Sequence, residues 1–157
     1  MSRDSKKQLI EQVIHLARDH QAANDAFDEV AYEKLGINRT DGRCLDIIQN
    51  RGPMTAGHLA ELSGLTTAAV TSVLDRLEKA GYARRVRDQR DRRQVIVELT
   101  PLLAERGTQI WGPLGEEAMT EIGRLSVDQL KLVMEFFRLG RDVNRRHIER
   151  VRGLSFD

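Results

Sequence analysis

Apolar residues recur at intervals of three and four through most of the chain, which is the spacing of the buried face of an amphipathic α-helix. One stretch differs: between residues 82 and 99, valines and a leucine alternate with polar residues on both sides of a wholly polar run, residues 87–93. Alternation with period two indicates half-buried strands, and the polar run between them indicates a hairpin loop. The pattern predicts a mostly α fold with one small β-hairpin.

Capping residues and glycines divide the helical pattern into six predicted helices, four before the hairpin and two after it. Hydroxyl and amide side chains favour the position before a helix, and glycine favours the position after one because it tolerates positive φ. Proline is tolerated at the first helical position. The residues in these roles are Gly36, Asn38 with Asp41, Thr55, Gly64, Thr66, Gly81, Thr100–Pro101, and Ser126 with Gln129.

The third and fourth predicted helices have the features of a helix-turn-helix. Such a motif needs a small residue where the helices touch, a glycine in the turn, and apolar residues that anchor the second helix. Ala60, Gly64, Val70 and Val73 occupy these places. A generic αα-hairpin also has a short turn and buried apolar residues, so these residues alone leave both interpretations open.

The outward face of the fourth predicted helix favours DNA binding. It carries Thr67, Thr71 and Ser72, followed by Asp75 and Arg76. Short hydrogen-bonding side chains let a helix enter the major groove closely, and an arginine can reach a guanine edge or a phosphate. An ordinary solvated helix more often carries Glu and Lys on this face.

The predicted hairpin adds a concentrated positive charge. Residues 84–93 hold six arginines against two aspartates, although the whole chain has a formal charge of only +1. A charged run is usually a solvated loop. Here it forms a hairpin tip directly after the helix with the hydroxyl face, where arginines can enter a minor groove or bind phosphates. The distribution of charge, and not its sum, therefore points to nucleic acid.

With these features the chain resembles the MarR family of bacterial regulators along essentially its whole length. The resemblance is strongest over residues 59–100. It rests on the run Asp-Arg-Leu-Glu at 75–78, followed by Ala-Gly-Tyr at 80–82, and on Asp-Arg-Arg at 91–93 before the alternating apolar residues.

The resemblance implies a winged helix-turn-helix domain at residues 37–100, between an N-terminal dimerisation helix (1–36) and C-terminal dimerisation helices (101–157). It also implies a homodimer whose two winged modules meet successive major grooves of a pseudo-palindromic operator in double-stranded DNA. We interpret the protein as a transcription regulator of the repressor type, although the residues themselves also permit an activator.

The predicted DNA-binding residues lie on the fourth helix and in the hairpin loop. They are Thr66, Thr67, Ala68, Thr71, Ser72, Arg76, Arg90, Arg92 and Arg93. By resemblance, Asp91 orients the wing arginine, which matches Arg93 here, and a carboxylate two residues away can hold a guanidinium through charge-assisted hydrogen bonds. In the alternative arrangement Arg92 enters the groove and Arg93 binds phosphate.

The resemblance further implies release from DNA by a small, often aromatic or phenolic effector that binds between the dimerisation helices and the winged module. His15, Cys44 and Trp111 lie on elements that can border such a cleft, although core packing is the more common role of such residues. Cys44 stands in an apolar run that favours a protonated, inert thiol, so we do not expect peroxide sensing. The four histidines have no metal-ligand spacing.

Other functions find less support in the sequence. We find no glycine-rich phosphate loop, nucleophile elbow or HExxH motif, so we predict a protein that is not an enzyme and needs no cofactor or metal. The alternative function is a helical protein-protein interaction module, which does not account for the arginine-rich hairpin. The absence of a secretory segment or an apolar run of about 20 residues predicts a cytoplasmic location without membrane contact.

Overall fold

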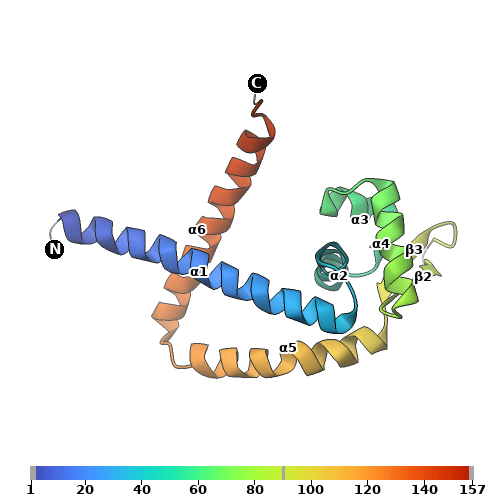
Figure 1. Cartoon of the computed structure of the whole chain (residues 1–157), viewed down its shortest axis with the longest axis horizontal. Helices are drawn as coiled ribbons and strands as arrows, with labels where there is room; N and C mark the ends of the chain where they lie inside the picture. The colour runs from blue at the N-terminus through green and yellow to red at the C-terminus, as the bar shows by residue number, and fades with distance from the viewer. Residues whose placement is uncertain (1–2, 90, 156–157) are drawn as a thin grey trace. The chain divides into compact units, whose positions relative to one another are not determined.

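The structure is a computed structural model that describes residues 3–89 and 91–155 (Figure 1). It confirms the expected mostly helical fold with a small β wing. The elements in chain order are α1 (Arg3–Leu35), α2 (Arg39–Arg51), β1 (Met54–Thr55), α3 (Ala56–Ser63), α4 (Thr67–Lys79), β2 (Ala83–Arg87), β3 (Val95–Leu99), α5 (Pro101–Ile122) and α6 (Val127–Arg152). The chain divides into two compact units, residues 1–110 and 111–157.

The helix boundaries follow from local capping chemistry, as predicted. At the start of α2 the Asn38 side chain accepts a hydrogen bond from the Asp41 backbone amide at 2.9 Å, and the Asp41 carboxylate accepts one from the Asn38 amide at 3.3 Å. Ser126 and Gln129 form the same reciprocal box at the start of α6. Thr55 and Thr66 cap α3 and α4. These bonds satisfy backbone donors that a helix leaves unpaired at its first turn.

The wing is an antiparallel three-stranded sheet in the order β1-β3-β2. Strands β2 and β3 form the predicted hairpin, with Ala83 opposite Leu99 and Arg87 opposite Val95. The sequence did not indicate β1, because two residues are too short to show alternation. Its pairing with β3 places Met54 opposite Val97 and attaches the start of α3 to the base of the wing.

Tyr82 joins three elements within the first unit. Its side chain has no exposed surface, and its hydroxyl donates a 2.9 Å hydrogen bond to the backbone oxygen of Leu35 at the end of α1. Arg106 of α5 donates to the same hydroxyl at 2.5 Å, with its guanidinium carbon 5.5 Å from the ring centroid. Tyr82 also follows α4 directly, so it fixes the ends of α1 and α4 against α5.

The first helix meets α2 at a close approach between Tyr32 and Gly42. Tyr32 is buried, and a Cβ atom at position 42 would overlap its ring. A larger residue at position 42 therefore requires the Tyr32 ring to move or the two helices to separate, which explains a glycine inside a helix where it would otherwise weaken the structure.

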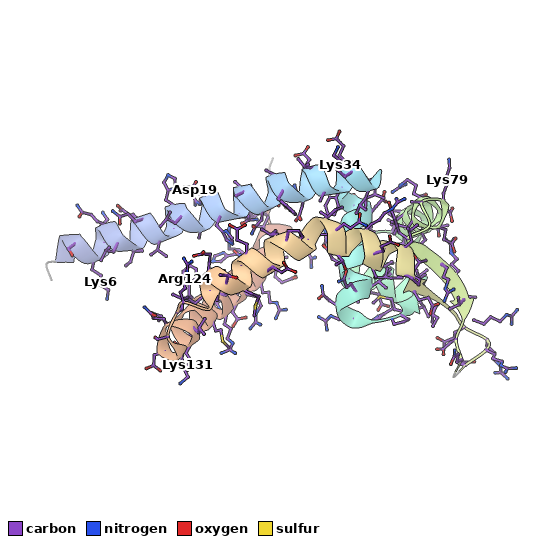
Figure 2. All side chains as sticks on the ribbon, turned by 90° about the horizontal axis from the view of Figure 1, so that it is seen from below. Lys6, Asp19, Lys34, Lys79, Arg124 and Lys131 are labelled. Atoms are coloured by element: carbon purple, nitrogen blue, oxygen red, sulfur yellow. The ribbon has the colours of Figure 1, made fainter. Side chains whose placement is uncertain are left out.

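Helix α1 in the first unit and helix α6 in the second expose apolar side chains. In α1, the side chains at positions 9, 10, 13 and 14 are about half exposed (45–51%), and α6 has no buried residue. Figure 2 shows that charged side chains such as Lys6 and Asp19 also project from α1. No helix in the described part of the chain combines the length and apolar character needed to cross a membrane. The exposed apolar side chains of α1 and α6 form surface of the kind that marks an interaction site.

Candidate nucleic-acid interface

Helix α4 has one buried and one exposed side. Val70, Val73, Leu74 and Leu77 pack into the core with almost no exposed surface. The predicted groove-facing residues lie on the other side and are all exposed: Thr66, Thr67, Ala68, Thr71 and Ser72. All five side chains are short and four of them carry a hydroxyl, so this surface of the helix is polar and does not extend far from the backbone.

The hydroxyls on this face are oriented by the helix itself. Thr71 Oγ1 donates to the Thr67 backbone oxygen at 3.0 Å, and Ser72 Oγ donates to the Ala68 backbone oxygen at 3.2 Å. Their hydrogens are engaged within the helix, and their oxygen lone pairs remain free to accept. Acceptors of this kind match the exocyclic amino groups that adenine and cytosine present in the major groove.

Arg76 differs from its neighbours on the helix because its guanidinium is bound to α2. Its Nη2 lies 2.6 Å from Asp41 Oδ1 and its Nε lies 3.1 Å from Asp41 Oδ2. Asp41 is 1% exposed, whereas the Arg76 side chain is 47% exposed. The hydrogen bond to Asp41 raises the pKa of Arg76 further above its ordinary value. This ion pair competes with the predicted contact of Arg76 with DNA.

The hairpin loop presents Arg92 and Arg93 to solvent. Within residues 3–89 and 91–155 no carboxylate pairs with either guanidinium. Arg90, which we also predicted to contact DNA, lies outside the described residues. Figure 2 shows nitrogen-tipped side chains gathered around the loop between β2 and β3.

Asp91 shapes the wing, but in a different way from the one expected. Its Oδ1 accepts from the backbone amide of Arg93 at 3.1 Å, and its Oδ2 accepts from Gln94 Nε2 at 3.2 Å. The expected bond to the Arg93 guanidinium is not formed, because the short Asp side chain in a turn reaches the backbone N–H two residues on. Asp91 therefore fixes the loop backbone and leaves the guanidinium exposed.

Among the hairpin arginines that the structure describes, Arg84 and Arg85 are engaged in ion pairs. Arg84 Nη2 lies 2.6 Å from Glu98 across the β2–β3 pair. Arg85 binds both Asp75, at 2.8 Å, and Glu78 of α4, which ties the wing to that helix. These partners were not predictable from the sequence, because they depend on strand register and on the packing of β2 against α4.

The role of the three residues predicted to bind an effector stays a prediction. Cys44 has no exposed surface, and burial followed by the charge of Asp41 raises the pKa of its thiol. His15 is exposed on α1, with Nδ1 2.8 Å from the carboxylate of Asp19. Trp111 belongs to the second unit, which begins at that residue.

A cavity of about 520 Å³ lies between α1 and α2. Its lining residues are Asp25, Asp28, Glu29, Tyr32, Ile37, Asn38, Arg39, Arg43 and Asp46. Burial, together with the charges of Asp46 and Asp28, raises the pKa of Tyr32 to about 12. Burial and Asp28 also raise the pKa of Asp46. The carboxylates outnumber the guanidinium groups, so the cavity is electrostatically negative. No cluster of three or more potential metal ligands occurs in the described part of the chain.

Comparisons with known proteins agree with this geometry. A family model described as the MarR family matches residues 37–95. Over 153 residues the chain is 34% identical to the uncharacterised HTH-type transcriptional regulator YcgE of Bacillus subtilis, covering 96% of this chain and 98% of that protein.

Two solved structures have a similar fold. The YusO protein of Bacillus subtilis matches with a TM-score of 0.62 and 19% identity, over 90% of this chain and 99% of that one. The MepR protein of S. aureus, solved as a complex with DNA, matches with a TM-score of 0.59 and 18% identity, over 82% and 97%.

Proposed function

Because the chain belongs to the MarR family of winged helix-turn-helix DNA-binding transcription regulators, we propose that it is a homodimeric repressor of a pseudo-palindromic operator. The observation that carries this proposal is the exposed hydroxyl face of α4 beside a wing whose Arg92 and Arg93 are exposed and have no carboxylate partner among the described residues. Such a protein acts on chromosomal DNA, and hence in the cytoplasm.

In the proposed complex, α4 lies in the major groove. Thr67, Thr71 and Ser72 face the base edges, and Thr66 and Ala68 lie at the helix start, where the backbone approaches the phosphates. The wing arginines, Arg90, Arg92 and Arg93, lie at the flanking minor groove and phosphates. A narrow minor groove focuses negative potential, which favours arginine there.

The second copy is proposed to bind through residues 1–36 and 101–157, which flank the winged domain at residues 37–100. Support comes from the apolar side chains of α1 and α6 that are exposed in the single chain. Two winged modules held in one dimer engage the two half-sites of an operator together, and palindromic operators reflect this symmetry.

Removal of a wing arginine tests the DNA-binding mode. We expect Arg93→Ala to weaken operator binding and to lower the slope of log K against log salt by about one unit per protomer, as for one lost backbone contact. The measurement is a fluorescence-anisotropy titration over a range of salt concentrations. Arg84→Ala is the matched control, because Arg84 is already neutralised by Glu98. Equal slopes for the wild type and Arg93→Ala would contradict the assigned contact.

Control by a small aromatic effector is part of the same proposal, and the cavity between α1 and α2 is its proposed site. The negative lining disfavours a phenolate and favours a neutral or cationic aromatic molecule. We expect an aromatic amine to raise the melting temperature and release labelled operator, and an aromatic acid of equal size to do neither. A screen in which only acids stabilise the protein would move the effector site elsewhere.

A further inference from the structure

The buried carboxylate of Asp41 binds two helices at once. Its Oδ2 accepts from the Asn38 amide at 3.3 Å, which closes the cap of α2, while both of its oxygens accept from Arg76 of α4, at 2.6 Å in the shortest bond. A carboxylate that is 1% exposed is unfavourable unless it is paired and hydrogen-bonded. Arg76 supplies that pairing across 35 residues of sequence.

We propose that Arg76 is a positioning residue: it sets the rotation of α4 about its axis through Asp41 and does not itself contact DNA. The buried side chains of α4 make apolar contacts, which carry little directional preference, whereas an arginine–carboxylate pair with two parallel hydrogen bonds has a defined geometry. Ser72 lies one helical turn before Arg76. The rotation that the pair fixes is therefore the one that directs the hydroxyls of Thr71 and Ser72.

Two further ion pairs hold the same part of α4 to the wing. Asp75, the residue before Arg76, binds Arg85 of β2 at 2.8 Å, and Glu78 binds the same arginine. Consecutive residues of α4 are thus tied to α2 in one direction and to the wing in the other. Turning Arg76 toward a phosphate would break the first of these ties and leave Asp41 buried without its counter-charge.

The inference rests on α4 entering the groove as proposed above, and the salt dependence of binding distinguishes positioning from contact. The probe is a duplex selected from a random library by the wild-type protein. For Arg76→Gln we expect about tenfold weaker operator binding, with an unchanged salt slope and unchanged affinity for scrambled duplex. Asp41→Asn should weaken binding similarly, and the double variant should be no weaker than the weaker single variant.

Arg76→Lys separates the two roles most sharply. Lysine keeps the positive charge that a phosphate contact needs but loses the two parallel hydrogen bonds to Asp41. We expect it to bind operator as weakly as Arg76→Gln, with the wild-type salt slope. Rescue by lysine, or a slope lowered by about one unit per protomer in Arg76→Gln, would overturn the inference in favour of a direct contact.

Two further outcomes keep the test decisive. If Arg76→Gln does not fold, Arg76→Lys and Asp41→Asn are compared in its place. Asp41→Asn frees the guanidinium of Arg76, so wild-type or tighter operator binding by this variant would also overturn the inference. If the wild-type protein selects no preferred duplex from the library, the proposed function is overturned before any variant is compared. The inference is then overturned with it.

Discussion

Phe137→Glu in α6 is expected to yield a monomer that binds the operator at least about 100-fold more weakly than the wild type. Phe137 is 59% exposed in the single chain and packs edge-to-face on Phe136, with ring centroids 5.7 Å apart. A carboxylate at this position would have to be desolvated in the proposed dimer interface. Loss of the dimer removes the high effective concentration of the second winged module at its half-site, which contributes about 10²–10⁴ in affinity.

Sedimentation velocity and operator titration together check this result. Lys131→Glu serves as the matched control: it adds a carboxylate to the same helix at an exposed position, where the only ion pair lost is the 3.6 Å contact with Asp128. It should remain dimeric and bind normally. A Phe137→Glu protein that sediments as a dimer with wild-type affinity would show that other surfaces hold the two copies together.

The second large effect is expected at Tyr82, on the stability of the fold. Tyr82→Ala should lower the free energy of unfolding by about 3–5 kcal/mol, because it removes a fully buried ring and leaves a cavity. Tyr82→Phe keeps the ring but leaves the Leu35 carbonyl without the hydroxyl donor, which is expected to cost about 1–3 kcal/mol.

Urea denaturation followed by circular dichroism measures both changes, at one fixed protein concentration because the proposed dimer couples unfolding to association. Val95→Ala, at a half-exposed position of the neighbouring strand β3, is the control and should change stability by less than about 0.5 kcal/mol. If Tyr82→Phe were as destabilising as Tyr82→Ala, the hydroxyl network with Leu35 and Arg106 would account for the whole effect, and packing of the ring for none of it.

The secondary structure was predictable where its signals are local. The caps at Asn38, Thr55, Thr66 and Ser126 depend on residues within one helical turn, and all four occur as expected. The hairpin was predictable from alternation on both sides of a polar run. Strand β1 was not, because two residues become a strand only by pairing with β3, about 40 residues further along the chain.

The candidate site shows the same division between local and distant interactions. The exposed face of α4 follows from helical periodicity, so the positions of Thr67, Thr71 and Ser72 were predictable. The partner of Arg76 was not, because Asp41 looks like an ordinary cap residue until α2 packs against α4. The cavity was missed for a similar reason, since its carboxylates come from two helices and no single segment contains the cluster.

The burial of Cys44 makes this protein convenient to label with dyes. Cys44 is the only cysteine in the sequence, and its thiol has no exposed surface and a raised pKa, so it reacts slowly with maleimides. A cysteine introduced in the exposed hairpin loop would therefore be modified selectively, giving one fluorophore per subunit. Energy transfer between the two wings of the proposed dimer would then report their separation with and without DNA.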